Sequence, residues 1–535
     1  MIITTLQILL SLVAVLVVVA VLARKLNIAP SILLVVAGVG LALIPGLPPV
    51  TLAPEFVLLM ILPPLIYSAG VAMSWREFKF NLRPIILLAF GCVVFTTCTV
   101  AAAAHYLLGL PWAVGFVLGA IVAPPDVVAP LAIARRLGLP HRLLVVLEGE
   151  GLANDATALI MYRFAVAAVA TGAFSLPEAT GSFIAIVICE IAYGIGVGWL
   201  SLRLRRWARD PRIEITLSLM TPYLAYWVPA HFGGSGVLAT VAAGLYISWN
   251  GPLLISSATR LQGIFFWDFI VYLIEGFVFL LTGLQARTLI ERAQDLSLSD
   301  ILIATLLTTA IIIVARFVWV FPGTYLPRWI SPHLRARDPA PPWQWIFILS
   351  FTGIRGVVSL AAALAIPLTL DSGAPFPYRD LILFVSFGVI IITLVGQGLM
   401  LPSVIRWLGI ANAAKEERYH EREAELTARR ETAQYALQRL EELAVERHLS
   451  EELLEVNRAR HNSRLKLLPE SLDNVRDTIE MTELRMELID AERGFLHRLL
   501  RDGKITDESR RRIERELDLE EIGINTRRGN GDAPL

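Results

Sequence analysis

The strongest constraint on this chain is a series of long apolar segments separated by short polar ones. A helix needs about 20 mainly apolar residues to cross a bilayer, and thirteen segments come close to that length or exceed it. They are residues 3–23, 29–46, 54–73, 84–108, 111–134, 143–170, 181–202, 214–230, 234–249, 265–286, 299–322, 342–370 and 378–405. We therefore predict an all-α, polytopic membrane protein with about 13 transmembrane helices.

Charged residues are distributed unevenly, which indicates two domains. Residues 1–408 contain 24 Lys and Arg against 18 Asp and Glu, whereas the much shorter segment 409–535 contains 23 against 29. The second segment also has apolar residues at helical spacing. We expect a transmembrane domain over 1–408 and a charged, helical cytoplasmic domain over 409–535. This second domain is either a solvated helical bundle, a regulatory domain or a dimer-forming one.

The loops between the predicted spans indicate an orientation, because Lys and Arg collect in cytoplasmic loops. With the N-terminus outside, the inner loops hold seventeen Lys and Arg residues. The outer loops hold only Arg287, Arg292 and Arg379. We therefore expect a multi-pass protein of the plasma or inner cell membrane, with its N-terminus outside and its tail in the cytoplasm.

Several classes of protein are disfavoured by what the sequence contains. Cys92, Cys98 and Cys189 lie within apolar runs, which is typical of small core residues. The eight histidines have no metal-ligand spacing near a carboxylate or thiol, and neither HExxH nor a Walker lysine motif occurs. We expect no enzymatic activity, no cofactor and no nucleic-acid partner.

Ionisable residues inside the predicted spans are the first candidates for function, because each costs about 2.5–3.5 kcal/mol on insertion scales. There are nine, which indicates a polar pathway: Asp126, Glu148, Glu150, Asp155, Arg163, Glu190, Glu275, Arg316 and Arg355. Four of these are expected to form structural pairs inside the bundle: Arg163, Glu190, Glu275 and Arg316.

Asp126 lies in a segment that cannot form a regular helix. Pro124 and Pro125 precede it and Pro130 follows, and proline lacks the N–H that a helix interior requires. Irregular backbone at membrane depth is tolerated where it is buried or lines a cavity, and broken helices form the ion sites of secondary transporters. Asp126 is therefore a candidate ion ligand; the alternative is a proline kink in which Asp126 pairs structurally.

The next span carries three polar groups with a defined angular relation. On a helix, Glu150 and Asn154 share a face, whereas Asp155 lies about 140° around from Glu150. This separation predicts two roles: a fixed polar bracket, and a titratable group that faces a cavity.

Arg355 is flanked by Gly353 and Gly356 in the span 342–370. A guanidinium at this depth needs a carboxylate, and we predict that Glu150 provides it. Two interrupted spans at corresponding positions in the two halves of the domain also indicate inverted repeats.

These motifs resemble one family. Residues 148–155, Glu-Gly-Glu-Gly-Leu-Ala-Asn-Asp, resemble the Gly-Glu-Ser-Leu-x-Asn-Asp motif of the cation:proton antiporter-1 family, the NhaP and NHE-type sodium/proton exchangers. Pro125-Asp126-Val127 is similar to that family's Thr-Asp-Pro or Val-Asp-Pro break. The segment 353–356, Gly-Ile-Arg-Gly, resembles its Gly-Leu-Arg-Gly.

The resemblance implies a role for each matching residue. Asp155 and Asp126 would bind the transported Na⁺ (or K⁺, Li⁺) and H⁺. Asn154 would be the non-titrating neighbour, held by Glu150 and Arg355. An Asn in place of a second Asp implies one proton per cation.

The resemblance also has implications outside the ion site. Glu148 would attract cations at a cytoplasmic funnel, and the protein would form a homodimer within the lipid bilayer. Gly151 and Pro125 replace a Ser and a Thr that supply oxygen ligands in the family, which leaves the choice between Na⁺, K⁺ and Li⁺ open.

Four alternatives to sodium/proton exchange follow from the same residues. They are a K⁺/H⁺ antiporter on the same scaffold, an ion channel, an intramembrane enzyme, and a transporter-derived sensor that acts through the tail.

Overall fold

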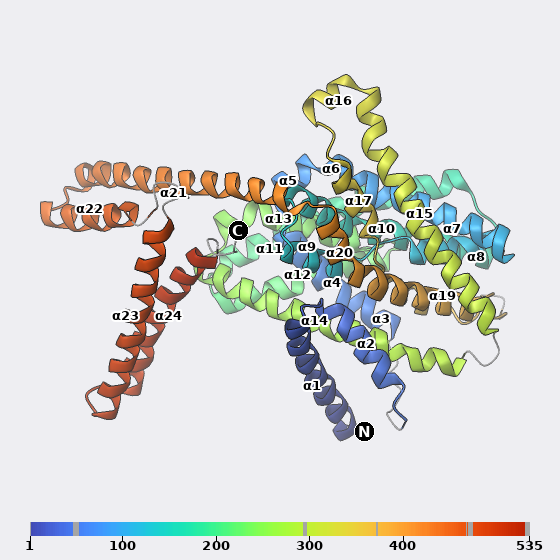
Figure 1. Cartoon of the computed structure of the whole chain (residues 1–535), viewed down its shortest axis with the longest axis horizontal. Coiled ribbons are helices and arrows are strands. Elements are labelled where there is room, and N and C mark those ends of the chain that lie inside the picture. The colour runs from blue at the N-terminus through green and yellow to red at the C-terminus, as the bar shows by residue number, and fades with distance from the viewer. Residues whose placement is uncertain are drawn as a thin grey trace. The chain divides into compact units, whose positions relative to one another are not determined.

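The computed structural model describes residues 2–45, 53–292, 297–370, 373–466, 468 and 475–529. These residues are predominantly helical, and their β-structure is an isolated antiparallel bridge between Thr369 and Pro375. The chain divides into two compact units, Met1–Ala411 and Asn412–Leu535. Figure 1 labels the helices of both units.

Each of the thirteen predicted spans coincides with one helix or with a run of helices. Before the site these are α1 (Ile2–Leu26), α2 (Pro30–Ala42), α3–η1–α4 (Pro54–Ala72) and α6–η2–α7 (Leu82–Leu108), where η marks a π-helical segment. The next three spans are α8 (Trp112–Val122) with α9 (Val128–Arg136), α10 (His141–Thr171) and α11 (Leu176–Ala208). Gly46, the end of the second predicted span, lies outside the described residues.

The second half of the membrane domain follows the same rule. Its helices are α12 (Pro211–His231), α13 (Val237–Leu254), α14 (Ser257–Arg292), α15 (Leu298–Ile330), α17 (Trp343–Phe351) with α18 (Val357–Leu364), and α19–η4–α20 (Arg379–Trp407). Two short helices, α5 (Trp75–Phe80) and α16 (Pro332–Arg337), lie in connections.

Eight helices in the described part of the chain are long and apolar enough to cross a membrane. α2 and α8 are apolar but shorter. The structure confirms an all-helical polytopic protein, whereas the number of crossings stays a prediction.

Close helix packing in this unit depends on small residues, as is usual inside membranes. A Cβ at Gly38 of α2 would overlap the backbone of α14, and a Cβ at Gly283 of α14 would overlap α2. A Cβ at Gly194 of α11 would likewise overlap the carbonyl oxygen of Ala239 in α13. These glycines allow the backbones of α2 and α14, and of α11 and α13, to lie in direct contact.

Loops that were predicted to share one side of the membrane contact one another. Arg136 donates a hydrogen bond to the carbonyl oxygen of Asn27 at 2.6 Å, and Arg142 forms an ion pair with Asp338 at 2.6 Å. The three loops concerned follow the first, fifth and eleventh predicted spans. Their meeting at one end of the bundle supports the predicted alternation of the chain.

The second unit consists of α21 (Ala411–Arg447) from Asn412 on, α22 (Glu451–Lys466), α23 (Val475–Arg501) and α24 (Asp507–Gly529). α23 and α24 lie side by side (Figure 1) and bury Ile489, Leu496 and Leu517. Arg493 of α23 pairs with Asp518 of α24 at 2.6 Å. The unit is therefore a set of charged helices with a small apolar core.

Candidate functional site

Two of the predicted spans are interrupted by non-helical segments, and these two segments are in contact. α8 ends at Val122 and α9 begins at Val128, whereas α17 ends at Phe351 and α18 begins at Val357. The backbone N–H of Asp126 donates to the carbonyl oxygen of Ile354 at 2.7 Å. The predicted broken helices are confirmed, and a backbone hydrogen bond joins the two breaks at a place that we call the helix crossing.

Arg355 binds carbonyl oxygens at this crossing. Its Nε donates to the Val122 oxygen at 2.7 Å and its Nη2 to the Ala123 oxygen at 3.2 Å, while Nη1 donates to Gly353. The last carbonyls of a helix have no partner within the helix, so the guanidinium satisfies the end of α8. The predicted pairing of Arg355 with Glu150 is therefore wrong.

Glu150 pairs instead with Arg316 of α15. Arg316 Nη1 and Nη2 reach the two carboxylate oxygens of Glu150 at 2.5 and 2.8 Å, and Arg316 Nε donates to the Leu349 oxygen at 3.1 Å. The Glu150 and Arg316 side chains are 0% and 2% exposed. A two-pronged bond of this type satisfies both buried charges, and the expectation that Arg316 forms a structural pair is confirmed.

Asn154 lies one turn after Glu150 and also holds the break. Its Nδ2 donates to the carbonyl oxygen of Pro125 at 2.7 Å, and its Oδ1 has no hydrogen-bond partner among the described residues. The predicted contacts of Asn154 with Glu150 and Arg355 are wrong. The amide satisfies a carbonyl that the prolines free from the helix.

Asp126 organises the start of α9. Its Oδ1 accepts a hydrogen bond from the backbone N–H of Val128 at 3.0 Å, which satisfies one of the free donors at the helix N-terminus. A Cβ at Gly356 would overlap the Asp126 carboxylate. Only glycine at position 356 therefore lets α18 approach Asp126 this closely.

Asp155 and Asp126 are the accessible acids of the site. Glu150 and Asn154 are fully buried, whereas Asp155 and Asp126 are only half-buried. The two aspartates are also close enough for their charges to interact. The angular separation predicted between Glu150 and Asp155 thus leaves Glu150 enclosed and Asp155 partly exposed.

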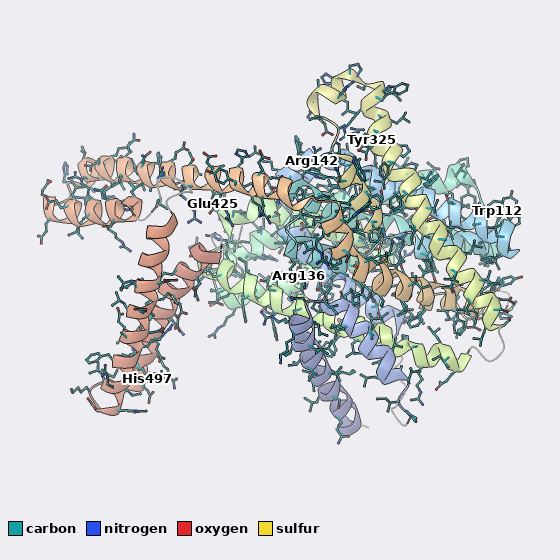
Figure 2. The ribbon with its side chains drawn as sticks, viewed as in Figure 1. Trp112, Arg136, Arg142, Tyr325, Glu425 and His497 are labelled. Atoms are coloured by element: carbon teal, nitrogen blue, oxygen red, sulfur yellow. The ribbon has the colours of Figure 1, made fainter. Side chains whose placement is uncertain are left out.

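Glu148 and Glu275 lie around these acids. Glu148 forms an ion pair with Arg135, and its side chain is 22% exposed. Glu275 of α14 interacts electrostatically with Asp126 and with Arg135. Glu148 and Glu275 therefore extend the group of acids from the helix break toward Arg135. The neighbouring Arg136 is labelled in Figure 2.

Thr393 is a site residue that the sequence analysis missed. Its Oγ1 accepts a hydrogen bond from the backbone N–H of Arg355 at 3.0 Å and donates to the Val389 oxygen at 2.8 Å. It lies in η4, the π-helical turn of the last span. A lone Thr in an apolar span carries no signal by which it could have been found.

Gly151, where the family motif has Ser, faces Val127. A Cβ at position 151 would overlap the Val127 side chain. The space of the missing hydroxyl group is therefore filled by a valine from the helix break.

Crossed, broken helices at membrane depth with accessible carboxylates define the class of secondary transporters. Residues 11–407 match the family pattern described as sodium/hydrogen exchanger, transmembrane. The chain belongs to this family of cation/proton antiporters, which are transporters and not enzymes.

Curated relatives agree with this membership. The chain is 34% identical over 529 residues to an uncharacterized Na⁺/H⁺ exchanger of Mycobacterium tuberculosis, which covers 97% of this chain and 96% of that protein. It is 31% identical to a sodium, potassium, lithium and rubidium/H⁺ antiporter of Bacillus subtilis, over 85% of this chain and 68% of that one.

The fold is similar to the sodium/proton antiporter MjNhaP1 of Methanocaldococcus jannaschii. The TM-score is 0.60 at 20% identity, and the match covers 75% of this chain and 98% of that structure.

Proposed function

We propose that this protein exchanges one monovalent cation for one proton, with Asp155 as the group for which the two ions compete. The observation that carries the proposal is the charge balance at the helix crossing. Glu150 and Arg316 neutralise each other. Asp155 forms no ion pair among the described residues, so one proton or one monovalent cation would neutralise its carboxylate.

The charge of the site couples transport to the binding of an ion. An uncompensated charge is expensive to move through the low-dielectric part of a membrane protein. The loaded site is neutral and can change its exposure from one side to the other, whereas the empty site is held back. The exchange is then electroneutral and is driven by ion gradients, at about 1.4 kcal/mol per tenfold concentration ratio.

Na⁺ is the proposed cation, with K⁺ as the second candidate. Carboxylate and carbonyl oxygens suit such hard cations. The Bacillus subtilis relative is named for sodium, potassium, lithium and rubidium, and Gly151 offers no hydroxyl ligand that would narrow the choice.

The cell membrane is the proposed location, with the N-terminus outside and the tail in the cytoplasm. The seventeen-to-three distribution of basic residues supports this orientation. A homodimer is proposed with it. The helices that carry the Asp126 and Asp155 region would move as one bundle, and the remaining helices would form the contact between protomers. The tail is proposed to regulate exchange.

The test is cation-dependent proton movement in inverted membrane vesicles. NaCl or KCl added to vesicles with an acidic interior should release protons in the wild type and not in Asp155→Asn. Asp268→Asn is the matched control, because Asp268 is an exposed acid in the membrane helix α14. Equal activity of Asp155→Asn and the wild type would contradict the proposal, and a response to K⁺ alone would assign the exchange to potassium.

A further inference from the structure

Three arginines from three helices converge on one carboxylate at an end of the membrane domain. Asp338, just after α16, pairs with Arg142 at 2.6 Å, with Arg328 at 2.6 Å and with Arg83 at 3.9 Å. Arg142 is labelled in Figure 2. We call these four residues the arginine cluster.

The arginine cluster carries an excess of two positive charges. Burial alone would raise the pKa of Asp338, but hydrogen bonds and charge interactions with Arg142 and Arg328 hold this pKa below its usual range. Asp338 therefore stays ionised near neutral pH and offsets only one of the three guanidinium groups.

The donors of the cluster are not all used. Arg328 Nε donates to the Asp338 carbonyl oxygen at 3.0 Å, and Arg142 Nε donates to Asn81 Oδ1 at 3.2 Å. Arg83 Nη2, in contrast, is buried and has no hydrogen-bond partner among the described residues. An unpaired buried donor on a charged group is costly, so an anion that accepts from it would be stabilised.

A cavity of about 70 Å³ lies beside these arginines. This volume is several times what one water needs. The cavity is lined by Arg83, Arg142 and Arg328 and by apolar residues that include Leu87, Trp319 and Leu349. Its walls thus combine charged and apolar side chains.

The cluster also lies at a membrane boundary. Arg83 is the second residue of the helical run Leu82–Leu108, Arg142 is the second residue of α10, and Arg328 is two residues before the end of α15. All three helices are long and apolar enough to cross a bilayer. Basic pockets between membrane helices at this level suit the head groups of anionic lipids.

We propose that the arginine cluster binds the phosphate group of an anionic phospholipid, with Arg83 Nη2 as the free donor. The phosphate occupies the cavity beside the three guanidinium groups, and the apolar walls accept the glycerol and the first part of a chain. Arginine suits this ligand because its planar fork matches phosphate oxygens. The apolar lining favours a lipid over a free phosphate ion.

The test is lipid binding by the purified full-length protein in detergent, which requires no transport. Phosphatidylglycerol and phosphatidylcholine with identical chains are titrated separately, and the bound lipids are counted by native mass spectrometry. Thermal unfolding is followed in parallel, because a ligand that binds the folded state raises the melting temperature. We expect phosphatidylglycerol to bind and to raise this temperature, and phosphatidylcholine to do neither.

Variants locate the site. Arg83→Gln should weaken phosphatidylglycerol binding about fivefold, equivalent to about 1 kcal/mol for one basic residue near the head groups. Arg335→Gln removes the same charge from an exposed position on α16 and should leave binding unchanged. If Arg83→Gln does not fold, Arg83→Lys decides: the lysine keeps the charge but lacks the Nη2 donor, so phosphatidylglycerol should bind more weakly than to the wild type.

Four outcomes would overturn the proposal. Equal stabilisation by the two lipids would show that the site does not select an anionic lipid. Displacement of the lipid by an equal concentration of inorganic phosphate would indicate a free-anion site. Equal weakening by Arg335→Gln and Arg83→Gln would indicate diffuse surface charge, and undiminished phosphatidylglycerol binding by a folded Arg83→Lys would show that Arg83 Nη2 is not the donor.

Discussion

Glu150 and Arg355 illustrate how a buried charge finds its partner. Both side chains are almost fully buried, and both need neutralising contacts. Glu150 obtains them from Arg316, which is 166 residues away in the chain. Arg355 obtains them from backbone carbonyls at the end of α8.

The Glu150–Arg316 pair can be tested by a double-mutant cycle. Glu150→Gln and Arg316→Gln should each lower the free energy of unfolding by about 3–5 kcal/mol, because each leaves an uncompensated buried charge. The double variant should lose much less than the sum of the two single losses. Thermal or denaturant unfolding in detergent provides the measurement.

The control for this cycle pairs Glu150→Gln with Arg355→Gln. These two losses should couple much more weakly than those of Glu150 and Arg316, since Glu150 and Arg355 interact only through their charges and do not form an ion pair. A strong coupling between Glu150 and Arg355, with none between Glu150 and Arg316, would contradict the structure.

The two broken spans depend on different local signals. Prolines 124, 125 and 130 make the first break evident from the sequence. The second break, between α17 and α18, contains no proline; its signals are Gly353 and Gly356 around a charged residue. What joins the breaks is the hydrogen bond between Asp126 and Ile354 and the close approach at Gly356, neither of which a single segment could reveal.

Gly356→Ala should therefore impair exchange through the crossing of the two helices. Its Cβ would overlap the Asp126 carboxylate and push α18 and α9 apart. We expect at least a tenfold lower rate of cation-dependent proton movement, because a displacement of about 1 Å at a binding site can cost about 10²-fold in rate. The rate is measured in inverted vesicles at equal protein content.

Gly40→Ala is the matched control, since nothing lies within 4 Å of a Cβ at position 40 of α2. This variant should exchange ions at the wild-type rate. If Gly356→Ala were equally active, the close contact at Asp126 would not matter for transport.

The membrane domain and the tail are separate compact units. Asp126, Asp155, Arg316 and Arg355 all belong to the first unit. The residues of the proposed ion site therefore all lie outside the tail, and removal of the tail can separate an exchanger from a sensor that acts through it.

A chain that ends at Ala411 should retain exchange, with a changed dependence on pH or ionic conditions if the tail is regulatory. The measurement is the same vesicle assay over a range of pH values, with the Asp155→Asn substitution introduced into the shortened chain as a control. Complete loss of exchange in a shortened protein that still folds and inserts would favour the sensor.

Much of the architecture could be read from local signals. Apolar length located all thirteen helical segments, because each helix in a bilayer must satisfy its own backbone and present apolar side chains to lipid. The prolines around Asp126 located the first helix break. The rotation of 100° per residue in α10 predicted that Glu150 and Asp155 point in different directions. These properties depend on neighbours within about ten residues.

The partners of the buried charges were decided only by the tertiary structure. Arg316 and Arg355 are both buried guanidinium groups in apolar spans, so sequence alone offers Glu150 two equivalent partners. Packing places Arg316 against Glu150, and the ends of α8 and α17 bring free carbonyls to Arg355. The convergence of Arg83, Arg142 and Arg328 on Asp338 likewise joins three helices. Local hydrophobicity and proline chemistry determine which segments are helices and where they break, whereas long-range packing determines which charges meet.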